Sequence, residues 1–308
     1  GWKPPEVFRA LGADGFTELW GVMWKPFDFD PKTQYPVITR VYPGRMDEYI
    51  PTRFQPVDAE TALSQLGSIV VRFGNRGGSR HRGLAYLEYA LDQFRDYGLA
   101  DKQAVIEELA ERFDFIDGEK VGIYGGSSGG FMTVSAMLVY PDFFKVAVSS
   151  SGNHENNIYN RWWSEKHHGV NEIEDAEGNI KFEYDIEKNS EVAKNLKGRL
   201  LLVTGDIDNN VHPGNTIRLA NALIKANKRF DFFVFPGERH GYRDMDDYWA
   251  WLRSEYFVKH LLGDEETSAD IAELNREHRN EPIPLEAINA AVINSTSNVM
   301  EGAARVVS

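Results

Sequence analysis

Short apolar and β-branched runs alternate with helix-like stretches along most of the chain. Strands buried on both faces read as continuous apolar runs, and amphipathic helices repeat their apolar positions every three or four residues. The alternation therefore predicts a mostly parallel central sheet with helices on both faces. Strands are expected at 16–24, 35–42, 68–73, 120–124, 145–149, 199–204 and 229–235, and helices around 105–113, 133–140, 217–224 and 245–256. No helical stretch separates the first two strands, so we expect them to form an antiparallel edge.

Two regions interrupt this alternation. Residues 153–189 are rich in aromatic, histidine and acidic side chains, which predicts an insertion over the carboxyl edge of the sheet. Residues 263–308 contain no Phe, Trp or Tyr, and read as a polar C-terminal extension with two short helices. We therefore predict one α/β domain over residues 1–262 and an extension over residues 263–308.

Composition narrows the classes of function. At 308 residues, with 42% apolar and 26% charged side chains, the chain is long enough for one large, soluble, folded domain. A net charge of −13 disfavours nucleic acid as a partner. The lack of cysteine excludes disulfides and thiolate catalysis, and slightly favours a periplasmic or secreted location over the cytoplasm. No apolar run approaches the roughly 18 residues that span a bilayer, and the sequence predicts no cofactor and no metal.

The segment from Val121 to Gly130 carries the strongest candidate for a catalytic residue. It runs from an apolar strand through Gly-Gly-Ser-Ser-Gly-Gly at 125–130 into a helical stretch, which is the arrangement of a nucleophile elbow. Glycines two places before and after Ser127 let strand and helix approach closely, and the helix start directs free N–H groups toward a forming oxyanion. A second frame would centre the motif on Ser128, and a Gly/Ser-rich connecting loop is the alternative without catalysis.

Two later strand ends supply partners for such a serine. An α/β-hydrolase carries its acid and its histidine after later strands, in the chain order Ser, Asp, His. The sixth predicted strand is followed by Asp206 and Asp208, and the seventh by His240. Because sites in these sheets lie beyond the carboxyl ends of the strands, we predict Ser127 as nucleophile, Asp208 as orienting acid and His240 as general base. Asp206 is the alternative acid, but fits better as a turn residue. The predicted fold is thus an α/β-hydrolase.

Taken together, these motifs resemble the prolyl oligopeptidase family of serine peptidases, and within it the dipeptidyl peptidase IV branch. The resemblance extends from about Phe16 to Leu262. It rests on the elbow at 125–130, on Tyr-Pro-Asp-Phe-Phe at 140–144, on the acid loop at 205–212 and on His240-Gly241. The Gly-Gly-Phe sequence at 129–131 matches the family only if Ser127 is the centre of the elbow, which favours Ser127 over Ser128.

The resemblance implies roles for six further residues. They are Tyr42 and the Ser128 backbone N–H as oxyanion donors, Tyr159 and Trp163 as walls of the pocket before the scissile bond, and Asn210 and Val211 as residues flanking it. Trp163 and the histidines at 167 and 168 depart from the tyrosine-rich pattern of the branch, so a preference for proline or alanine stays open. The basic, glycine-rich loop at 72–78 also matches a family loop, but its residues indicate no catalytic role.

The predicted function is that of a serine-type peptidase that hydrolyses short peptides through an acyl-enzyme, similar to a dipeptidyl peptidase. A carboxylesterase with the same triad is one alternative, and a non-catalytic hydrolase-fold binding module is another. The resemblance further implies a peptide substrate and an upstream β-propeller outside this chain, which opens on Gly-Trp-Lys-Pro-Pro without a hydrophobic leader. It leaves a homo-oligomer open.

Overall fold

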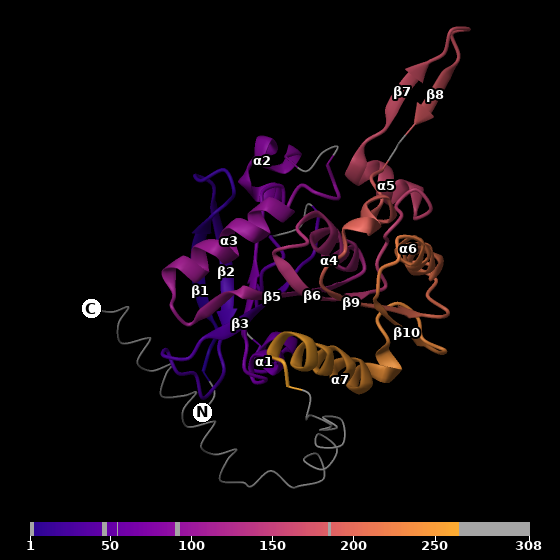
Figure 1. Ribbon diagram of the computed structural model, residues 1–308. Helices are drawn as coiled ribbons and strands as arrows, with labels where there is room; N and C mark the ends of the chain where they lie inside the picture. Colours follow the sequence, from indigo (N-terminus) through magenta and orange to yellow (C-terminus); the bar gives the residue numbers. More distant parts are fainter. Residues whose placement is uncertain (1–2, 45–47, 54, 90–92, 184–185, 265–308) are drawn as a thin grey trace. The chain divides into compact units, whose positions relative to one another are not determined.

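A computed structural model describes residues 3–44, 48–53, 55–89, 93–183 and 186–264. They belong to the first of two compact units, which runs from Gly1 to Thr267. Its centre is an eight-stranded sheet in the order β1-β2-β4-β3-β5-β6-β9-β10 (Figure 1). The strands are β1 (Glu6–Leu11), β2 (Glu18–Trp24), β3 (Tyr35–Arg40), β4 (Ile69–Phe73), β5 (Ile116–Gly126), β6 (Phe144–Ser150), β9 (Arg199–Gly205) and β10 (Asp231–Phe235). Neighbours from β4 to β10 run parallel, which confirms the predicted sheet.

Helices cover both faces of the sheet (Figure 1). One face carries α3 (Leu99–Arg112), α4 (Ser128–Val139) and α6 (Gly214–Lys225), and the other carries α1 (Ala59–Ser64) and α7 (Asp246–Phe257). Successive strand residues point to opposite faces, so Ile123 packs in the buried cluster with α3 and α4, whereas Tyr124 packs in the cluster with α7. Shorter helical segments are α2 (Leu84–Glu88), α5 (Arg161–His168), 3₁₀ turns at Arg80–Arg82, Asn189–Asn195 and Arg243–Met245, and a π-helical turn at Val258–Leu262.

The predicted pairing of the first two strands is wrong. β2 pairs antiparallel with β1 and with β4, whereas β3 lies between β4 and β5 and is parallel to both. After β3 the chain forms α1 and returns as β4, which occupies the edge that a direct pairing of β2 with β3 would need. The sequence concealed β1 because only Phe8 and Ala10 of its six residues are buried. An antiparallel edge therefore exists, but it is made by β1 and β2.

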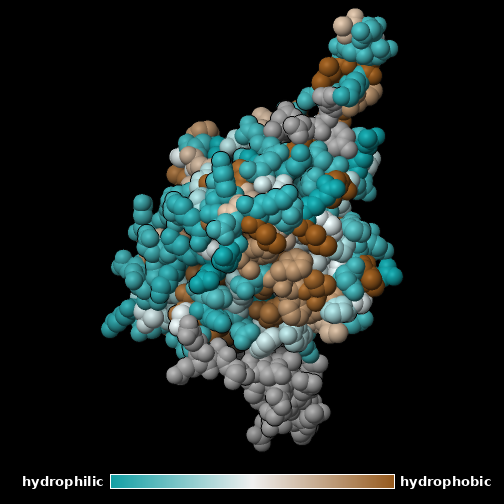
Figure 2. All heavy atoms as spheres, turned by 45° about the vertical axis from the view of Figure 1, so that its right-hand side comes forward, coloured by the Kyte–Doolittle hydropathy of each residue, from teal (hydrophilic) through white to brown (hydrophobic). Residues whose placement is uncertain are grey.

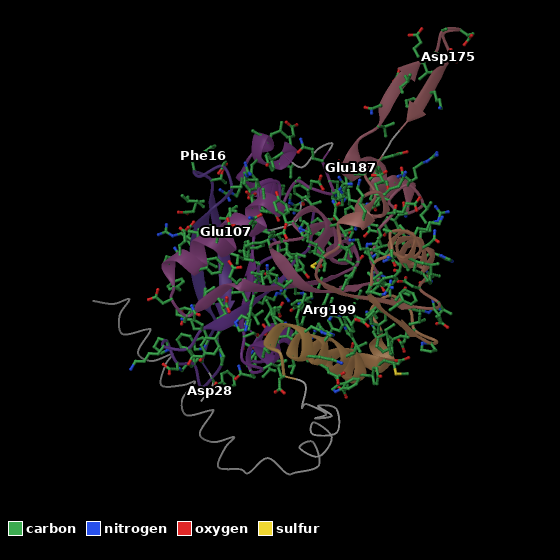
Figure 3. The ribbon with its side chains drawn as sticks, viewed as in Figure 1. Phe16, Asp28, Glu107, Asp175, Glu187 and Arg199 are labelled. Carbon is green, nitrogen blue, oxygen red and sulfur yellow. The ribbon has the colours of Figure 1, made fainter. Side chains whose placement is uncertain are left out.

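The predicted insertion at 153–189 contains α5 and a separate antiparallel hairpin, β7 (Asn171–Glu174) with β8 (Ile180–Glu183). The hairpin extends away from the central sheet, with Asp175 at its tip and Glu187 near its base (Figure 3). Asp175 closes the tip, because its Oδ1 accepts backbone hydrogen bonds from Glu177 at 3.0 Å and from Asn179 at 2.8 Å. This turn fixes the register of an otherwise exposed hairpin.

Apolar side chains gather on the surface near β10 and α7 (Figure 2). The edge strand β10 contributes Phe232 and Val234, which are both exposed. Within the described ranges, no helix combines the length and the apolar character needed to cross a bilayer. Beyond Asp264, the predicted C-terminal extension lies outside the described residues and stays a prediction.

Candidate active site

Ser127 forms the turn between β5 and α4 and has a left-handed backbone, with φ 56° and ψ −127°. Such a backbone costs a non-glycine residue about 1–3 kcal/mol unless its surroundings hold it. Two hydrogen bonds hold this one: the Ser127 N–H donates to the Ser150 carbonyl at 2.8 Å, and the Phe131 N–H donates to the Ser127 carbonyl at 3.1 Å. Ser128 is the buried first residue of α4, whereas Ser127 is partly exposed. The geometry therefore favours Ser127 as the centre of the elbow.

The flanking glycines are needed because strand, helix and β3 meet here without space for side chains. A Cβ atom on Gly125 would lie 2.6 Å from the carbonyl carbon of Gly129 and 2.7 Å from the Val41 carbonyl oxygen. A Cβ on Gly129 would collide with that same Val41 oxygen. The close approach brings the end of β3, and with it Tyr42, against the first turn of α4.

His240 and Asp208 form the central contact of the site. His240 Nδ1 lies 2.8 Å from Asp208 Oδ2; the Asp208 side chain is fully buried and the His240 side chain is 25% exposed. The loops that carry them are joined by backbone hydrogen bonds from Asp206 N–H to the Phe235 carbonyl and from Ile207 N–H to the Glu238 carbonyl, each 3.2 Å long. The acid and the imidazole are thus held by two loops that are fixed to each other.

The Asp208 carboxyl is held in its ionised form. Burial by itself would raise its pKa, but hydrogen bonds from His240 and from the backbone N–H groups of Asn210 and Val211 outweigh burial and keep the pKa below 3.8. Those backbone bonds to Oδ1 are 2.9 and 3.0 Å long. The alternative acid, Asp206, is exposed and accepts the Gly237 N–H at 2.7 Å, so it acts as a turn residue.

Ser127, Asp208 and His240 follow β5, β9 and β10, whose carboxyl ends share one edge because these strands are parallel. The end of β6 links them. The Ser151 N–H donates to the Val203 carbonyl at 2.8 Å, and its hydroxyl lies 2.7 Å from the Tyr242 hydroxyl. Tyr242 is buried, and its ring stacks on Phe235. The sequence did not reveal this pair, because the two residues lie 91 positions apart.

The predicted oxyanion donors lie beside the elbow. The Tyr42 ring packs against Gly129, since a Cβ there would be 3.3 Å from Tyr42 Cδ2. The Ser128 N–H belongs to the first turn of α4, where backbone N–H groups have no acceptor within the helix. Both groups are therefore next to Ser127 in the fold, although they come from β3 and α4.

The four predicted pocket residues lie together next to Asp208. The Tyr159 hydroxyl donates to Asn210 Oδ1 at 3.0 Å, and the rings of Tyr159 and Trp163 are 5.4 Å apart, edge to face. Val211 is buried. Burial raises the pKa of Tyr159, and the negative charges of ionised Tyr42 and of Asp208 raise it further, which reflects their proximity. These contacts join the insertion to both the acid loop and the elbow.

A buried polar network under α4 escaped the sequence-based prediction. His154 Nδ1 lies 3.2 Å from Asn189 Nδ2, which also donates to the Phe131 carbonyl at 3.0 Å. Burial lowers the pKa of His154 to about 3, so the imidazole is neutral and accepts the Asn189 amide proton. Ser149 completes the network by donating to the Gly130 carbonyl at 2.9 Å. The network supports the first turn of α4 from below. Among the described residues, no cluster of His, Asp and Glu is arranged to hold a metal ion.

Known proteins resemble this chain over most of its length. Human dipeptidyl peptidase 8 is 32% identical over 269 residues, which cover 85% of this chain and 28% of that protein. Dipeptidyl aminopeptidase A of Saccharomyces cerevisiae is 27% identical over 78% of this chain and 26% of its own length. The crystal structure of Porphyromonas gingivalis dipeptidyl peptidase 4 matches with a TM-score of 0.75 and 26% identity, over 85% of this chain and 36% of that one. The chain spans 36% or less of the length of each relative.

The family follows from a longer match. Residues 56–265 match the prolyl oligopeptidase family, and this range includes Ser127, Asp208 and His240. Tyr42 lies before it. The sheet order, the elbow and these matches confirm the predicted α/β-hydrolase fold. The chain belongs to the prolyl oligopeptidase family.

Proposed function

We propose that this chain is the catalytic domain of a serine peptidase of the dipeptidyl peptidase type, which cleaves short peptides through an acyl-enzyme. The observation that carries the proposal is the 2.8 Å contact between His240 and a buried, ionised Asp208, at the sheet edge that also carries the strained Ser127. Strain and buried charge both cost stability, so their coincidence at one sheet edge supports a catalytic role.

The proposed mechanism follows from the hydrogen bonds. Asp208 accepts the Nδ1 proton of His240, which leaves Nε2 free to take the Ser127 hydroxyl proton as Ser127 attacks the peptide carbonyl. Tyr42 and the Ser128 N–H donate to the oxyanion, and His240 then returns the proton to the leaving amine. Water hydrolyses the acyl-enzyme by the same steps. Asp208 stays ionised throughout, because its pKa lies below 3.8.

A dipeptidyl substrate is supported by the names of the relatives, which include dipeptidyl peptidase 8 and dipeptidyl aminopeptidase A. Tyr159 and Trp163 offer aromatic walls to the residue before the scissile bond, with Asn210 as a polar contact. The upstream β-propeller stays a prediction. The exposed apolar edge of β10 supports the homo-oligomer, because a second copy could cover it.

Covalent labelling by a fluorophosphonate tests the nucleophile. We expect labelling of the wild type and of Ser128→Ala, and none of Ser127→Ala, with folding checked by circular dichroism. Labelling that persists in Ser127→Ala and disappears in Ser128→Ala would move the nucleophile by one residue. A wild type that takes no label would instead support the non-catalytic binding module.

The carboxylesterase alternative shares the triad and differs in the leaving group. Turnover of dipeptidyl p-nitroanilides is compared with that of p-nitrophenyl esters of short acids. We expect kcat/KM for the anilides to fall when Tyr159 or Trp163 is replaced by Ala. An enzyme that hydrolyses the esters and leaves every dipeptidyl anilide intact would contradict the peptidase.

A further inference from the structure

Tyr49 packs against Tyr42, the proposed oxyanion donor. Their ring centroids are 5.1 Å apart and the ring planes are tilted by 33°. Tyr49 and the residue before it, Glu48, both have left-handed backbones, with φ values of 52° and 59°. Two consecutive non-glycine residues in this region are costly, and such a backbone persists only where the surroundings fix it.

Arg72, at the end of β4, holds Tyr49 from two directions. Its Nε donates to the Tyr49 carbonyl at 2.6 Å, and its guanidinium carbon lies 4.0 Å from the centre of the Tyr49 ring. The other side of this guanidinium faces Glu60, 3.5 Å away, which is buried and also bonds Arg40 at 2.9 Å. A planar guanidinium can stack and donate at once, which a lysine cannot do. Arg72 therefore fixes both the backbone and the ring of Tyr49.

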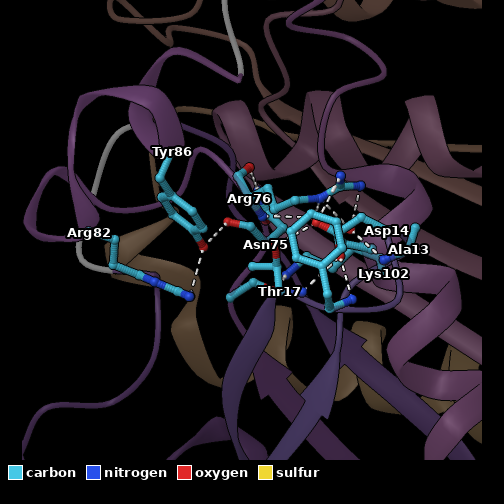
Figure 4. A network of polar contacts seen from close by, with 11 residues as sticks. Ala13, Asp14, Thr17, Asn75, Arg76, Arg82, Tyr86 and Lys102 are labelled. Carbon is cyan, nitrogen blue, oxygen red and sulfur yellow. Dashed lines mark hydrogen bonds and ion pairs between the residues drawn. The ribbon is translucent and has the colours of Figure 1, made fainter.

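Glu48 is held by the glycine-rich loop at 72–78. Its N–H donates to the Gly78 carbonyl at 3.0 Å, and its Oε1 accepts the Tyr86 hydroxyl at 2.7 Å. Arg82 donates to that hydroxyl at 3.2 Å (Figure 4). A Cβ on Gly74 would collide with the Glu48 carboxylate. The glycines of the loop thus make room for the residue that precedes Tyr49.

The loop itself is anchored on α3 (Figure 4). The Arg76 N–H donates to Asp101 Oδ2 at 2.8 Å, and its guanidinium lies 2.9 Å from Asp101 Oδ1. The buried Lys102 ammonium donates to the Gly74 carbonyl at 3.4 Å. Both partners come from α3, which packs on the central sheet. A rigid support therefore extends from α3 through the loop to Glu48 and Tyr49.

We propose that Tyr49, clamped by Arg72 and by the glycine-rich loop, is a positioning residue that fixes the Tyr42 ring and so directs its hydroxyl to the oxyanion formed at Ser127. This gives the loop at 72–78 a role in the reaction, although none of its side chains touches the substrate. The inference rests on the proposed function, because it requires Tyr42 to act as a donor. A donor that is misplaced by a fraction of its hydrogen-bond length loses much of its effect on the transition state.

The test is a double-mutant cycle with the purified protein and a dipeptidyl p-nitroanilide. Tyr42→Phe should lower kcat by roughly 10²-fold, the usual cost of one oxyanion donor. Tyr49→Leu should lower kcat by about 10-fold with KM unchanged within about 2-fold, since only the transition state is affected. Tyr49→Phe keeps the ring that both neighbours contact and should restore kcat. In the Tyr42→Phe background, Tyr49→Leu should cost less than about 2-fold, because no hydroxyl remains to be aimed.

Tyr89→Leu is the matched control. Tyr89 stacks with Arg76 at 4.2 Å, so this variant removes a similar tyrosine–arginine contact from the same loop without touching Tyr42. We expect its kcat to stay at the wild-type value. If Tyr49→Leu does not fold, as judged by its melting transition, Arg72→Lys replaces it. Lysine keeps the charge beside Glu60 but loses the stack and the planar donor, and should give the same loss of kcat.

Two outcomes overturn the inference. One is an unchanged kcat in Tyr49→Leu or, where that variant does not fold, in Arg72→Lys. The other is a loss of the same factor with and without the Tyr42 hydroxyl, which would mean a general structural effect. If Tyr42→Phe itself retains full kcat, the oxyanion role of Tyr42 fails and this inference fails with it. Labelling at Ser127 is measured separately, so the peptidase proposal can stand or fall on its own.

Discussion

Replacing Asp208 by Asn is the most informative single change, because the hydrogen bonds around the carboxylate dictate how the amide must sit. Oδ1 accepts N–H groups from Asn210 and Val211, and Oδ2 faces His240 Nδ1 at 2.8 Å. The Asn oxygen must stay with the two backbone donors, so its NH₂ faces the imidazole. His240 Nδ1 then has to accept, and the proton moves to Nε2. Histidine in this tautomer cannot take the proton of Ser127.

The magnitude follows from the cost of the alternative. Flipping the amide would restore the tautomer but would point NH₂ at two N–H donors, and each unsatisfied buried group costs about 1–3 kcal/mol. The flipped form is therefore about 2–6 kcal/mol less stable and is populated at a few per cent or less. The negative charge that stabilises the imidazolium is also lost. Together these effects predict a fall in kcat of about 10³–10⁴-fold, or roughly 4–5.5 kcal/mol in the activation barrier.

The assay compares kcat for a dipeptidyl p-nitroanilide in Asp208→Asn and in Asp206→Asn. Asp206 lies in the same loop, but it is exposed and only accepts the Gly237 N–H, so its replacement should change kcat by less than about 3-fold. Melting curves establish that both variants are folded. An Asp208→Asn enzyme with more than about a tenth of the wild-type kcat, or an Asp206→Asn enzyme that is the more damaged of the two, would refute the assignment.

Three further predictions concern the surroundings of the triad. Gly129→Ala forces a methyl group into the Val41 carbonyl, and should lower the free energy of unfolding in urea by about 1–3 kcal/mol and slow fluorophosphonate labelling. Tyr159→Phe removes the 3.0 Å hydrogen bond to Asn210, worth about 0.5–1.5 kcal/mol, and should raise KM for peptides about 2- to 10-fold with little change in kcat. Burial holds the pKa of His154 at about 3, against 6.5 for an unperturbed histidine, so the unfolded chain takes up a proton first as the pH falls below 6.5. Stability should therefore fall by about 2 kcal/mol between pH 7 and pH 5 in the wild type beyond the fall in His154→Gln, measured by urea unfolding at both values.

The parts of the fold that the sequence predicts are the buried ones. Each strand from β3 to β6, and then β9 and β10, contains an apolar run, and the proposed triad residues follow three of these runs directly. The exposed strands β1, β7 and β8 lack such runs and were missed. Tyr42 and Tyr159 were identified only through the family resemblance, because a strand-end or insertion tyrosine carries no signal of its own. The His154 and Asn189 network depends on contacts between residues 35 positions apart, which no local pattern encodes.

Backbone strain marks the site more clearly than residue type does. Among the described residues, the non-glycine residues with positive φ are Glu48, Tyr49, Ser127, Ser151, Asn227 and Tyr242. Asn227 lies just past the end of α6, where asparagine commonly adopts this backbone. The others follow β3, β5, β6 and β10 at the carboxyl edge, and each costs about 1–3 kcal/mol against a total stability of about 5–15 kcal/mol. Glutamate, serine and tyrosine give no sequence signal of such a backbone, so only the fold reveals that the strain is concentrated around Ser127. Contacts such as the Ser151–Tyr242 hydrogen bond and the Arg72–Tyr49 clamp must offset it, and this is why residues that never touch the substrate should affect catalysis.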